Sequence, residues 1–296
     1  MISLSGGEKR SGRMFEGKSV LITGGEGMIG MELRDLLHEY RNCDITIADI
    51  KNGDDLRDFK RCIELCRNKD YVFHLAGVKG SPKMTEQQPV NFMTPMLQFD
   101  TNMIEAASLC KVDRFLYTSS IAVLNPESDR FPAWAKKTAE VLIEAYRKQY
   151  PYGTEFCIVR PANVYGRYDN FDNPNAMVIT SLIKKAMVGH IDVWGDGSQI
   201  RDFINAKDVA RGMIIAMEEM CREPINLCSG EEHTIREVVD IIVDTLPTFS
   251  VQYDVHAKRG DEKRVMESNG HLIGFKPKIK LEKGIKEVIE WLKSQS

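Results

Sequence analysis

The sequence predicts an α/β fold: a Rossmann-type, doubly wound parallel sheet with a smaller, partly interleaved C-terminal lobe. Short β-branched runs alternate with amphipathic stretches over most of the chain, and a glycine-rich segment directly follows the first of these runs. Alternation of this kind is typical of βαβ units, in which the strands lie parallel. The 296 residues, 43% of them hydrophobic, can bury a sizeable core, which excludes a disordered or fibrous chain.

The first 166 residues carry this alternation most clearly. The expected strands are 19–25, 44–50, 71–77, 114–120 and 156–166, and the expected helices between them are 30–40, 56–67, 95–110 and 135–149. Together with a later strand, these elements predict a sheet of six or seven parallel strands.

A turn-rich linker, 167–174, follows, and both of its flanks look like folded protein. Beyond it we expect helix 176–187, strand 192–195, loop 195–203, a helix from 208 to about 220, strand 225–229, a helix beginning at 234 and helix 281–293. The predicted units are a Rossmann domain at 17–166, to which 201–228 returns, and a substrate lobe at 167–200 and 229–296. Residues 1–16 have no apolar segment, so we expect a disordered extension rather than a signal peptide.

Composition and charge narrow the class of partner. The formal net charge is −3, with 40 basic against 43 acidic residues, so no overall field favours nucleic acid or a membrane surface. The apolar runs fall far short of the roughly 20 residues that cross a bilayer. The seven cysteines form no pair of CxxC motifs and have no histidine at metal-ligand spacing, so we expect reduced thiols and no metal site. We expect a cytoplasmic protein with a small-molecule ligand.

A dinucleotide site is predicted at residues 23–30, TGGEGMIG, between the first strand and the first helix. Gly24 permits the tight turn, Gly27 leaves room for a pyrophosphate, and Gly30 lets the helix pack closely on the strand. Amides at the helix N-terminus receive the phosphate charge. An acid, Asp49, ends the next strand 19 residues beyond Gly30, where such an acid binds the adenosine ribose.

Asp49 favours NAD over NADP. Its carboxylate can accept hydrogen bonds from the ribose hydroxyls and would repel a 2′-phosphate, and the three residues after it include no arginine. Lys51 is the basic residue among these three. An ordinary helix or turn cap is the alternative role for Asp49.

Seven motifs occur in order along the chain: TGGEGMIG (23–30), DLRD (55–58), HLAG (74–77), YTSS (117–120), RPANVYG (160–166), WGDGSQIRDF (194–203) and GFKP (274–277). On these motifs the chain resembles the extended short-chain dehydrogenase/reductases, specifically the nucleotide-sugar epimerases and dehydratases, from about residue 18 to 291. Residues 167–183 and the WGDGSQIRDF segment most resemble the branch that handles GDP-linked sugars. Related segments also occur in enzymes for UDP sugars.

The resemblance implies NAD as cofactor and a nucleotide-diphosphate sugar, GDP- or UDP-linked, as substrate. The residues implied in cofactor binding are Gly24, Gly27, Met28, Ile29, Gly30, Asp49, Ile50, Asp55, Leu56, Leu75, Ala76, Gly77, Lys79, Asn91, Thr118, Lys136 and Pro161. Among them, Asp55 and Leu56 should flank the adenine, and Asn91 should lie beneath the sheet near the nicotinamide. A solvated surface lysine is the alternative for Lys79.

The residues implied in substrate binding are Ser120, Asn163, Val178, Arg201 and Arg264. Asn163 should hold the sugar nucleotide, and the two arginines should clamp its phosphates. Surface salt bridges are the alternative role for both arginines. His74, inside an apolar strand, is expected to be a core histidine with satisfied hydrogen bonds.

The family's chemistry is hydride transfer between a sugar carbon and the nicotinamide, served by a Ser or Thr and by a Tyr-x-x-x-Lys pair on one helix. The phenolate removes the sugar hydroxyl proton, while the lysine lowers the phenol pKa and holds the ribose. Ser120 matches the hydroxyl position, and Lys136 matches the lysine, since Glu140 follows it at the family's spacing. Pro132 stands where the tyrosine should be, and none of the nine tyrosines has a lysine four residues later.

Three interpretations of the missing tyrosine stay open. The first is an active NAD-dependent epimerase that works at C4 through a keto sugar and takes its base from elsewhere: Tyr165, Tyr168, Glu127, Asp129 or Lys79. The second is an enzyme of reduced activity, in which Ser120 and Lys136 position the sugar and water relays the proton. The third is a protein that binds NAD and a sugar nucleotide without catalysis.

Two further expectations complete the assignment. A nucleotide-sugar dehydrogenase or dehydratase is the alternative chemistry. The resemblance also implies a homodimer that pairs through the two long helices, 95–110 and 135–149.

Overall fold

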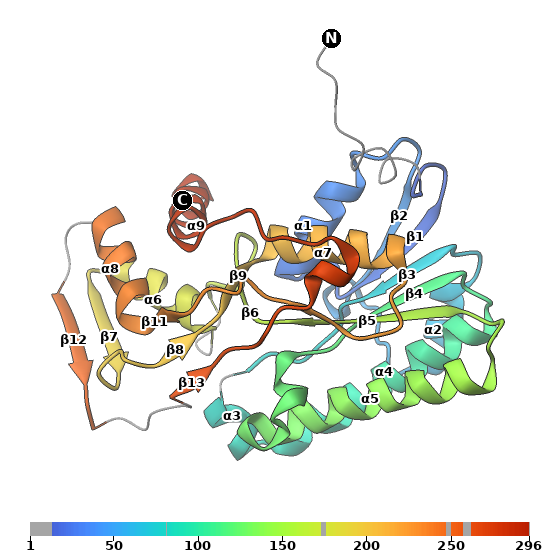
Figure 1. The fold of residues 1–296 in the computed structure, drawn as a ribbon, viewed down its shortest axis with the longest axis horizontal. Helices are drawn as coiled ribbons and strands as arrows, with labels where there is room; N and C mark the ends of the chain where they lie inside the picture. The colour runs from blue at the N-terminus through green and yellow to red at the C-terminus, as the bar shows by residue number, and fades with distance from the viewer. Residues whose placement is uncertain (1–13, 81, 173–175, 247–249, 257–261, 296) are drawn as a thin grey trace, which may run out of the picture.

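A six-stranded parallel sheet forms the core of the larger lobe of the molecule (Figure 1). The computed structural model describes residues 14–80, 82–172, 176–246, 250–256 and 262–295. Across the sheet the strands are β10 (Ile225–Leu227), β5 (Glu155–Pro161), β4 (Arg114–Thr118), β3 (Tyr71–His74), β1 (Ser19–Thr23) and β2 (Asp44–Ala48). Every neighbouring pair is parallel, so the carboxyl ends meet at one edge. The strand order reverses between β1 and β3, where such sheets bind ligands, and the predicted Rossmann-type sheet is confirmed.

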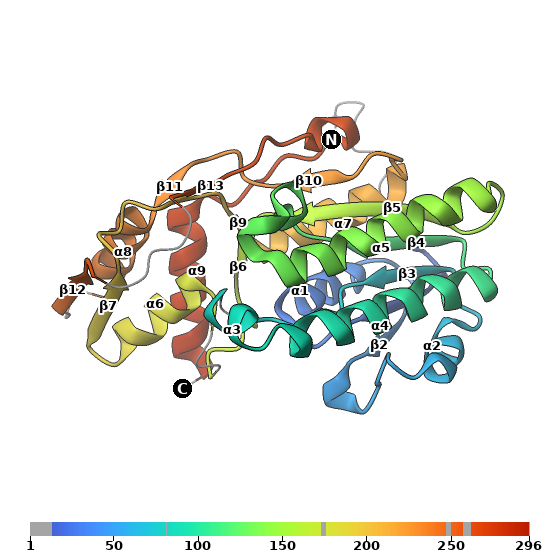
Figure 2. The ribbon, with the colours of Figure 1, turned by 90° about the horizontal axis from the view of Figure 1, so that it is seen from below.

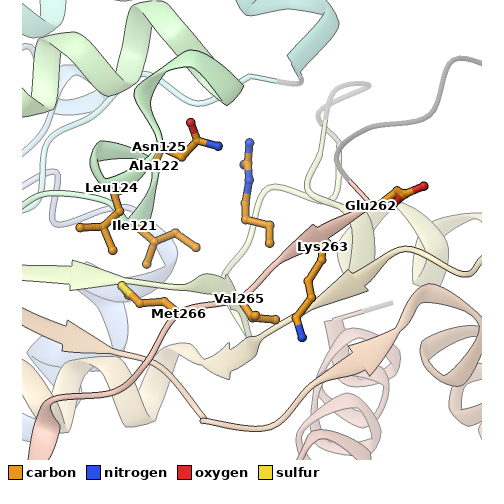
Figure 3. A pocket seen from close by; sticks show the side chains of 9 residues that line it. Ile121, Ala122, Leu124, Asn125, Glu262, Lys263, Val265 and Met266 are labelled. Atoms are coloured by element: carbon orange, nitrogen blue, oxygen red, sulfur yellow. The ribbon is translucent and has the colours of Figure 1, made fainter.

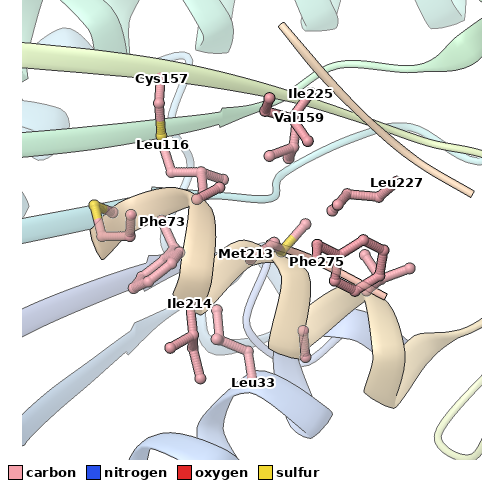
Figure 4. Close-up of a cluster of buried hydrophobic side chains, with 14 of the residues drawn as sticks. Leu33, Phe73, Leu116, Cys157, Val159, Met213, Ile214, Ile225, Leu227 and Phe275 are labelled. Carbon is pink, nitrogen blue, oxygen red and sulfur yellow. The ribbon is translucent and has the colours of Figure 1, made fainter. Parts of the chain in front are cut away.

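Helices cover both faces of this sheet (Figure 2). One face carries α2 (Phe59–Cys66), α4 (Pro89–Leu109) and α5 (Arg130–Gln149), and the other carries α1 (Met28–Leu37) and α7 (Ala206–Glu219). Strand side chains alternate between the layers, so Leu21 packs with the α2 and α4 side chains, while Val20 and Ile22 pack with those of α1 and α7. Figure 4 shows the second layer, where Leu33 and Met213 meet the strand residues. Burial on both faces explains why the strands are nearly continuous apolar runs.

The smaller lobe has a hydrophobic core of its own. Its helices are α6 (Val178–Met187), α8 (Ile235–Thr245) and α9 (Leu281–Gln295), and β7 (His190–Trp194) pairs in parallel with β12 (Ser250–Asp254). A three-stranded sheet contains β11 (His233–Thr234), β8 (Ile200–Arg201) and β13 (Lys263–Arg264), and β6 (Asn163–Tyr165) pairs with β9 (Phe203–Asn205). In the chain as a whole, the other elements among the described residues are α3 (Pro82–Gln87) and short 3₁₀ helices at Ile50–Asn52, Ile121–Leu124, Pro126–Asp129 and Gly270–Ile273.

Several predicted boundaries differ from the structure. The helix expected at 95 begins at Pro89, which occupies a first-turn position that tolerates proline, and Pro95 lies inside it. The helix expected at 135 begins at Arg130. The segment expected as a loop at 195–203 contains β8 and the start of β9, whose two or three residues are too few to show an alternating pattern.

Phe15 corrects the expectation for the amino-terminal segment. Residues 1–13 lie outside the described residues, but the expectation of a disordered extension is wrong for residues 14–16. The Phe15 side chain is fully buried, with its ring centroid 5.1 Å from that of Tyr40, 5.7 Å from Tyr71 and 6.0 Å from Phe73. One aromatic side chain therefore attaches the segment to the core beneath β1 and β3.

We predict that Phe15→Ala lowers the free energy of unfolding by about 3–5 kcal/mol, because truncating a buried phenylalanine leaves a cavity. Urea unfolding followed by circular dichroism measures the change. Tyr152→Ala is the matched control, since the Tyr152 side chain is fully exposed. Equal unfolding midpoints for F15A and the wild type would show that the aromatic contact contributes nothing.

None of the helices within the described ranges is both long enough and apolar enough to cross a lipid bilayer.

Candidate active site

The glycine loop after β1, which we call the glycine cradle, lies so close to neighbouring backbone that a Cβ atom at Gly24 or Gly30 would collide with it. Gly24 has a positive φ of +66°, and a Cβ there would stand 2.8 Å from the backbone of Ala76. A Cβ on Gly30 would stand 2.6 Å from the Cα atom of Gly25, and one on Gly27 would stand 3.1 Å from the Gly24 carbonyl oxygen. Helix α1 begins at Met28, directly behind this loop. The geometry fits a pyrophosphate placed against backbone amides at a helix N-terminus.

Asp49 ties the end of β2 to the glycine loop. Its carboxylate accepts hydrogen bonds from the Glu26 amide (3.1 Å) and from the Lys51 amide (3.0 Å), and the second bond caps the 3₁₀ turn at Ile50–Asn52. The Lys51 ammonium donates to the Glu26 carbonyl oxygen across 3.2 Å. The capping role is thus present in the structure, and the same carboxylate lies beside the loop predicted to hold the dinucleotide.

The other residues predicted to bind the adenine end of the dinucleotide follow β2, which pairs with β1 in the sheet. Asp55 is ion-paired with Arg57, whose hydrogen bonds lower the pKa of the Asp55 carboxyl. The Leu56 side chain is buried, and its carbonyl oxygen accepts a hydrogen bond from Asn102 at 3.0 Å. Ile50, by contrast, is exposed beside Asp49.

The carboxyl edge of the sheet brings together most of the residues predicted for the nicotinamide side. Residues Leu75, Ala76 and Gly77 directly follow β3, while Thr118 and Pro161 end β4 and β5. The Thr118 hydroxyl is buried and has no hydrogen-bond partner within the described part of the chain. Buried hydroxyls normally have a partner, so this atom, like the glycine cradle, fits a bound ligand.

Asn91 does not lie beneath the sheet, and that prediction is wrong. Its side chain is exposed in the first turn of α4 and donates to the Gln88 side-chain oxygen at 3.1 Å. The buried face of α4 instead carries Asp100, together with Met96 and Phe99. Asn91 precedes Asp100 by nine residues, or about two and a half helical turns, so the two side chains lie on opposite sides of α4.

A chain of buried polar side chains runs beneath this edge of the sheet. The Thr23 hydroxyl lies 2.6 Å from His74 Nδ1, and His74 Nε2 lies 2.9 Å from Asp100 Oδ1. Tyr117 donates its hydroxyl proton to Asp100 Oδ2 at 2.6 Å, and Lys136 Nζ lies 3.4 Å from the same oxygen. All five side chains are at least nine-tenths buried. We call these residues the buried polar chain.

The protonation states of this chain follow from burial and charge. Burial lowers the pKa of His74 despite the neighbouring carboxylate, so the imidazole is neutral. Burial alone would raise the pKa of Asp100, but the Lys136 ammonium and the His74 and Tyr117 hydrogen bonds lower it overall, so the carboxyl is ionised. Burial and the Asp100 charge raise the pKa of Tyr117, so its hydroxyl keeps its proton.

Sequence reasoning missed Asp100 and Tyr117. His74 does have satisfied hydrogen bonds in the core, as expected, but through this network. A signal was present for Asp100, because Met96, Phe99 and Met103 place apolar side chains around it at helical spacing. An acid on the apolar face of a helix requires buried hydrogen-bond donors. Lys136, which was already predicted to be catalytic, is one of these donors.

Ser120 lies just beyond the end of β4, and its hydroxyl accepts a hydrogen bond from the Ala122 amide at 3.2 Å. Lys136 Nζ also lies 3.5 Å from the Ala76 carbonyl oxygen, at the carboxyl edge. Pro132 occupies the first turn of α5. The two predicted catalytic residues, Ser120 and Lys136, thus both lie near the carboxyl edge of the sheet. The position four residues before Lys136 in α5, where the family has a tyrosine, is occupied by Pro132.

The predicted substitute bases are engaged elsewhere. The Tyr165 hydroxyl is buried in the core of the smaller lobe, 3.5 Å from the Leu281 carbonyl oxygen, and burial raises the pKa of this phenol. Tyr168 donates to Asp35 of α1 at 3.0 Å. Neither phenol therefore offers a hydroxyl to the edge where Lys136 lies.

The other three candidates also have partners in the structure. Glu127 accepts a hydrogen bond from the indole of Trp134 at 3.2 Å, and Asp129 accepts one from the Thr85 hydroxyl at 3.1 Å. The Lys79 ammonium lies 3.4 Å from Asp169 in the linker between the lobes. Each of these three side-chain contacts would have to break before the group could act as a base at the carboxyl edge.

A cavity of about 580 Å³ separates the end of β4 from the smaller lobe (Figure 3). One wall is the 3₁₀ segment after Ser120, and the other is the strand segment that includes Arg264; the lining residues are Ile121, Ala122, Leu124, Asn125, Glu262, Lys263, Arg264, Val265 and Met266. Arg264 and Arg201 are direct partners on neighbouring strands, with His233 opposite Arg201 on its other side. One rung of this small sheet therefore carries Arg264, which lines the cavity, together with Arg201 and His233.

Two predicted substrate residues have structural partners. Asn163 donates its side-chain amide to the Asp202 carbonyl oxygen at 2.8 Å, which fastens β6 to the segment after Arg201. The Asp202 carboxylate accepts hydrogen bonds from Ser229 and Gly230, and burial raises its pKa. Val178 is the first residue of α6 and is half-buried against the core of the smaller lobe.

Among the described residues no group of three or more metal-ligating side chains comes together.

A glycine cradle at the switch point of a parallel sheet, with a serine and a lysine at the same edge, defines a dinucleotide-dependent enzyme. The model of the NAD dependent epimerase/dehydratase family matches residues 20–228. The chain belongs to this family, and the predicted membership of an enzyme family is confirmed.

Relatives of known activity match over nearly the whole chain. A GDP-L-fucose synthase from Sinorhizobium fredii is 26% identical over 94% of this chain and 96% of the relative. A GDP-mannose 3,5-epimerase from Arabidopsis thaliana is 25% identical over 95% of this chain and 83% of the relative. A solved UDP-N-acetylglucosamine 4-epimerase from Methanobrevibacter ruminantium, in complex with UDP-N-acetylmuramic acid, superposes with a TM-score of 0.83 at 26% identity, covering 95% and 100% of the two chains.

We predict that Gly24→Ala abolishes dinucleotide binding, because its Cβ would collide with the Ala76 backbone 2.8 Å away. Binding is measured by titrating NADH and following energy transfer from the tryptophans. Gly17→Ala is the matched control: Gly17 has a similar φ of +68° but no atom within 4 Å of its Cβ position, so it bears the backbone strain alone. Undiminished NADH affinity in G24A would rule out the cradle as the pyrophosphate site.

Proposed function

We propose that this protein is an NAD-dependent enzyme that moves hydride at a carbon of a nucleotide-diphosphate sugar through a keto form, with epimerisation at C4 as the leading reaction. One observation carries the proposal: a single cavity is lined by Ile121, the residue after Ser120, and by Arg264. A sugar nucleotide in this cavity would have the segment that follows Ser120 on one wall and the basic side chains of Lys263 and Arg264, for its diphosphate, on the other.

The dinucleotide, when bound, supplies and accepts hydride. The chain's own residues would do the rest: the glycine loop and Thr118 hold the dinucleotide, Ser120 orients the sugar oxygen, and Lys136 presents its ammonium at the edge of the sheet. Ala76 fixes that ammonium through its carbonyl oxygen. Residues 17–166 with 201–228 would bind the dinucleotide, and 167–200 with 229–296 the sugar nucleotide.

The nucleotide-diphosphate part of the proposal rests on Arg201 and Arg264. Guanidinium groups suit phosphate oxygens because their planar donors match two acceptors at once. The register that pairs the two strands places both side chains at one rung. The relatives act on GDP-linked and UDP-linked sugars according to their names, which supports either nucleotide for this chain.

Asp49 supports NAD rather than NADP as the cofactor, because its carboxylate lies at the glycine loop and would repel a 2′-phosphate. We expect NADH to bind at least about tenfold more tightly than NADPH, which corresponds to roughly 1.4 kcal/mol. Asp49→Asn should reduce this preference. Asp44→Asn, at the opposite end of β2, is the control. A wild-type preference for NADPH in fluorescence titrations would contradict the assignment and point to Lys51 as the phosphate ligand.

Reduction of a keto sugar without epimerisation is the second candidate, and the missing tyrosine favours it. Epimerisation at C4 requires a group that first removes the hydroxyl proton and later returns a proton, whereas reduction only requires a donor. Pro132 at the tyrosine position removes the usual base, while Lys136 remains beside an ionised carboxylate.

The function is tested by offering UDP-, GDP-, dTDP- and CDP-sugars with NAD, and GDP- and UDP-linked 4-keto-6-deoxyhexoses with NADH, while recording absorbance at 340 nm. Product stereochemistry is read by NMR. An epimerised sugar supports the first candidate, and NADH consumption with a keto sugar supports the second. Tight binding of NADH and sugar nucleotide without any turnover at high enzyme concentration would leave a binding protein.

We also propose a homodimer in the cytoplasm. Large apolar side chains are exposed along the adjacent helices α4 and α5: Val90, Leu109, Trp134 and Val141. Large apolar side chains exposed on two adjacent helices are a feature of protein–protein contact surfaces. The resemblance to this family implies pairing through these two helices, which supports a second copy of the chain as the partner.

A further inference from the structure

The surroundings of Lys136 consist of acceptors. Its ammonium nitrogen lies 3.4 Å from Asp100 Oδ2, 3.5 Å from Asp100 Oδ1 and 3.5 Å from the Ala76 carbonyl oxygen. The face of the Tyr117 ring lies 4.7 Å below it, and an aromatic face attracts a cation. Neutral lysine would place a lone pair among these groups, whereas the ammonium donates to all of them. Each of these neighbours therefore suits the N–H donors of an ammonium group.

The Asp100 carboxylate is fixed in the opposite role. Three donors converge on it, from His74 of β3, Tyr117 of β4 and Lys136 of α5, and an ionised carboxylate can only accept. The imidazole can donate through Nε2 because Nδ1 faces the Thr23 hydroxyl at 2.6 Å. A buried carboxylate with this many donors keeps a single position, since losing any donor would leave it uncompensated.

Two other charged groups border this cluster. Glu140 follows Lys136 by one turn of α5 and is buried, but its carboxylate forms two hydrogen bonds with Arg160, at 2.6 and 2.8 Å. Lys137 pairs with the outer side of Glu140 at 3.4 Å and is partly exposed. Within the described residues, Asp100 is thus the carboxylate that contacts the Lys136 ammonium.

Lys136 also lies at the carboxyl edge of the sheet, the edge from which the cavity wall that begins at Ile121 continues. It contacts Ala76 at the carboxyl edge of the sheet, beside the strand end that carries Thr118 and Ser120. The phenols and acids considered as replacement bases have hydrogen bonds elsewhere. An ammonium group at this edge has a proton to give and no free lone pair with which to take one.

We propose that Lys136 is the proton donor of this site in place of a phenol, and that Asp100 is the residue that positions it. The inference rests on the proposed function and selects its second candidate, the reduction of a nucleotide-linked keto sugar. As the carbonyl carbon receives hydride from the reduced dinucleotide, a Lys136 N–H bond breaks and an O–H bond forms on the carbonyl oxygen. The products are the hydroxyl sugar, the oxidised dinucleotide and a neutral amine, which regains its proton from water.

Lys136→Arg separates proton donation from charge. Arginine keeps the positive charge and the donors for Asp100 and Ala76 but does not give up a proton. We expect NADH affinity in fluorescence titrations to stay within about threefold of the wild type, while the single-turnover rate with a GDP-linked 4-keto-6-deoxyhexose falls about 10²–10⁴-fold. Lys137→Arg, one residue along the same helix, is the matched control and should leave both quantities unchanged.

Chemical rescue tests the proton itself. Lys136→Ala leaves room for a small amine beside Asp100, so methylammonium should restore the rate by about tenfold or more at saturation. Tetramethylammonium has the same charge but no N–H proton, and should restore nothing. Asp100→Asn combined with Lys136→Ala should abolish rescue by methylammonium, because the carboxylate that holds the amine is gone. The NADH affinity of each variant shows whether its fold is intact.

If D100N does not fold, Tyr117→Phe provides the second test, since it removes one hydrogen bond from Asp100 and leaves the charge in place. It should slow the single turnover while NADH affinity stays unchanged.

The outcomes separate the two claims. Wild-type turnover that survives K136R, or rescue of K136A by tetramethylammonium as well as by methylammonium, overturns the proton-donor role and leaves the proposed enzyme intact. Rescue that persists without the Asp100 charge overturns the positioning role. A wild-type protein that binds NADH and the keto sugar but turns over neither substrate class overturns the proposed function, and this inference with it.

Discussion

The close approach between the glycine loop and the end of β3 is the constraint from which the rest of the site follows. The hydrogen of Gly24 points at the Ala76 backbone, where even a methyl group would collide. The carbonyl oxygen of Ala76 is also the group that meets the Lys136 ammonium. One residue therefore touches both the dinucleotide cradle and the lysine. Any change in the spacing of β1 and β3 would displace the phosphate site and the proton-transfer group together.

The buried polar chain makes this spacing difficult to alter. Thr23 and His74 are direct partners across β1 and β3, and His74 and Tyr117 are partners across β3 and β4, so the chain follows a single rung of the sheet. A one-residue slip of any of these strands would turn its polar side chain to the opposite face and leave Asp100 short of donors. A buried ion pair is costly to form, but once formed it penalises other registers strongly.

Local patterns in the sequence were sufficient for the features that depend on a few neighbouring residues. The glycine loop, the parallel strands and the lysine of α5 belong to this group, because each has a fixed spacing. Features decided by distant contacts were not predictable. Asp100 is one example: the apolar residues around it mark the buried face of its helix, but the side chains that donate to its carboxylate come from other elements far away in the sequence. The strands β8 and β13 contain two residues each, so their pairing depends on the fold around them. Phe15 follows a polar segment, and its burial depends on contacts with Tyr40, Tyr71 and Phe73, which are distant in the sequence.

The path of the chain between the two lobes limits how such proteins diversify. The edge strand β10 and the covering helix α7 are encoded after the first segment of the smaller lobe, at Ile225–Leu227 and Ala206–Glu219. A fragment that ended at residue 166 would expose the edge of β5 and an uncovered apolar face, both of which promote aggregation. The smaller lobe therefore cannot be exchanged as one contiguous cassette. A new sugar specificity has to arise by point substitution within the lobe, or by recombination with two crossovers that preserve residues 201–228.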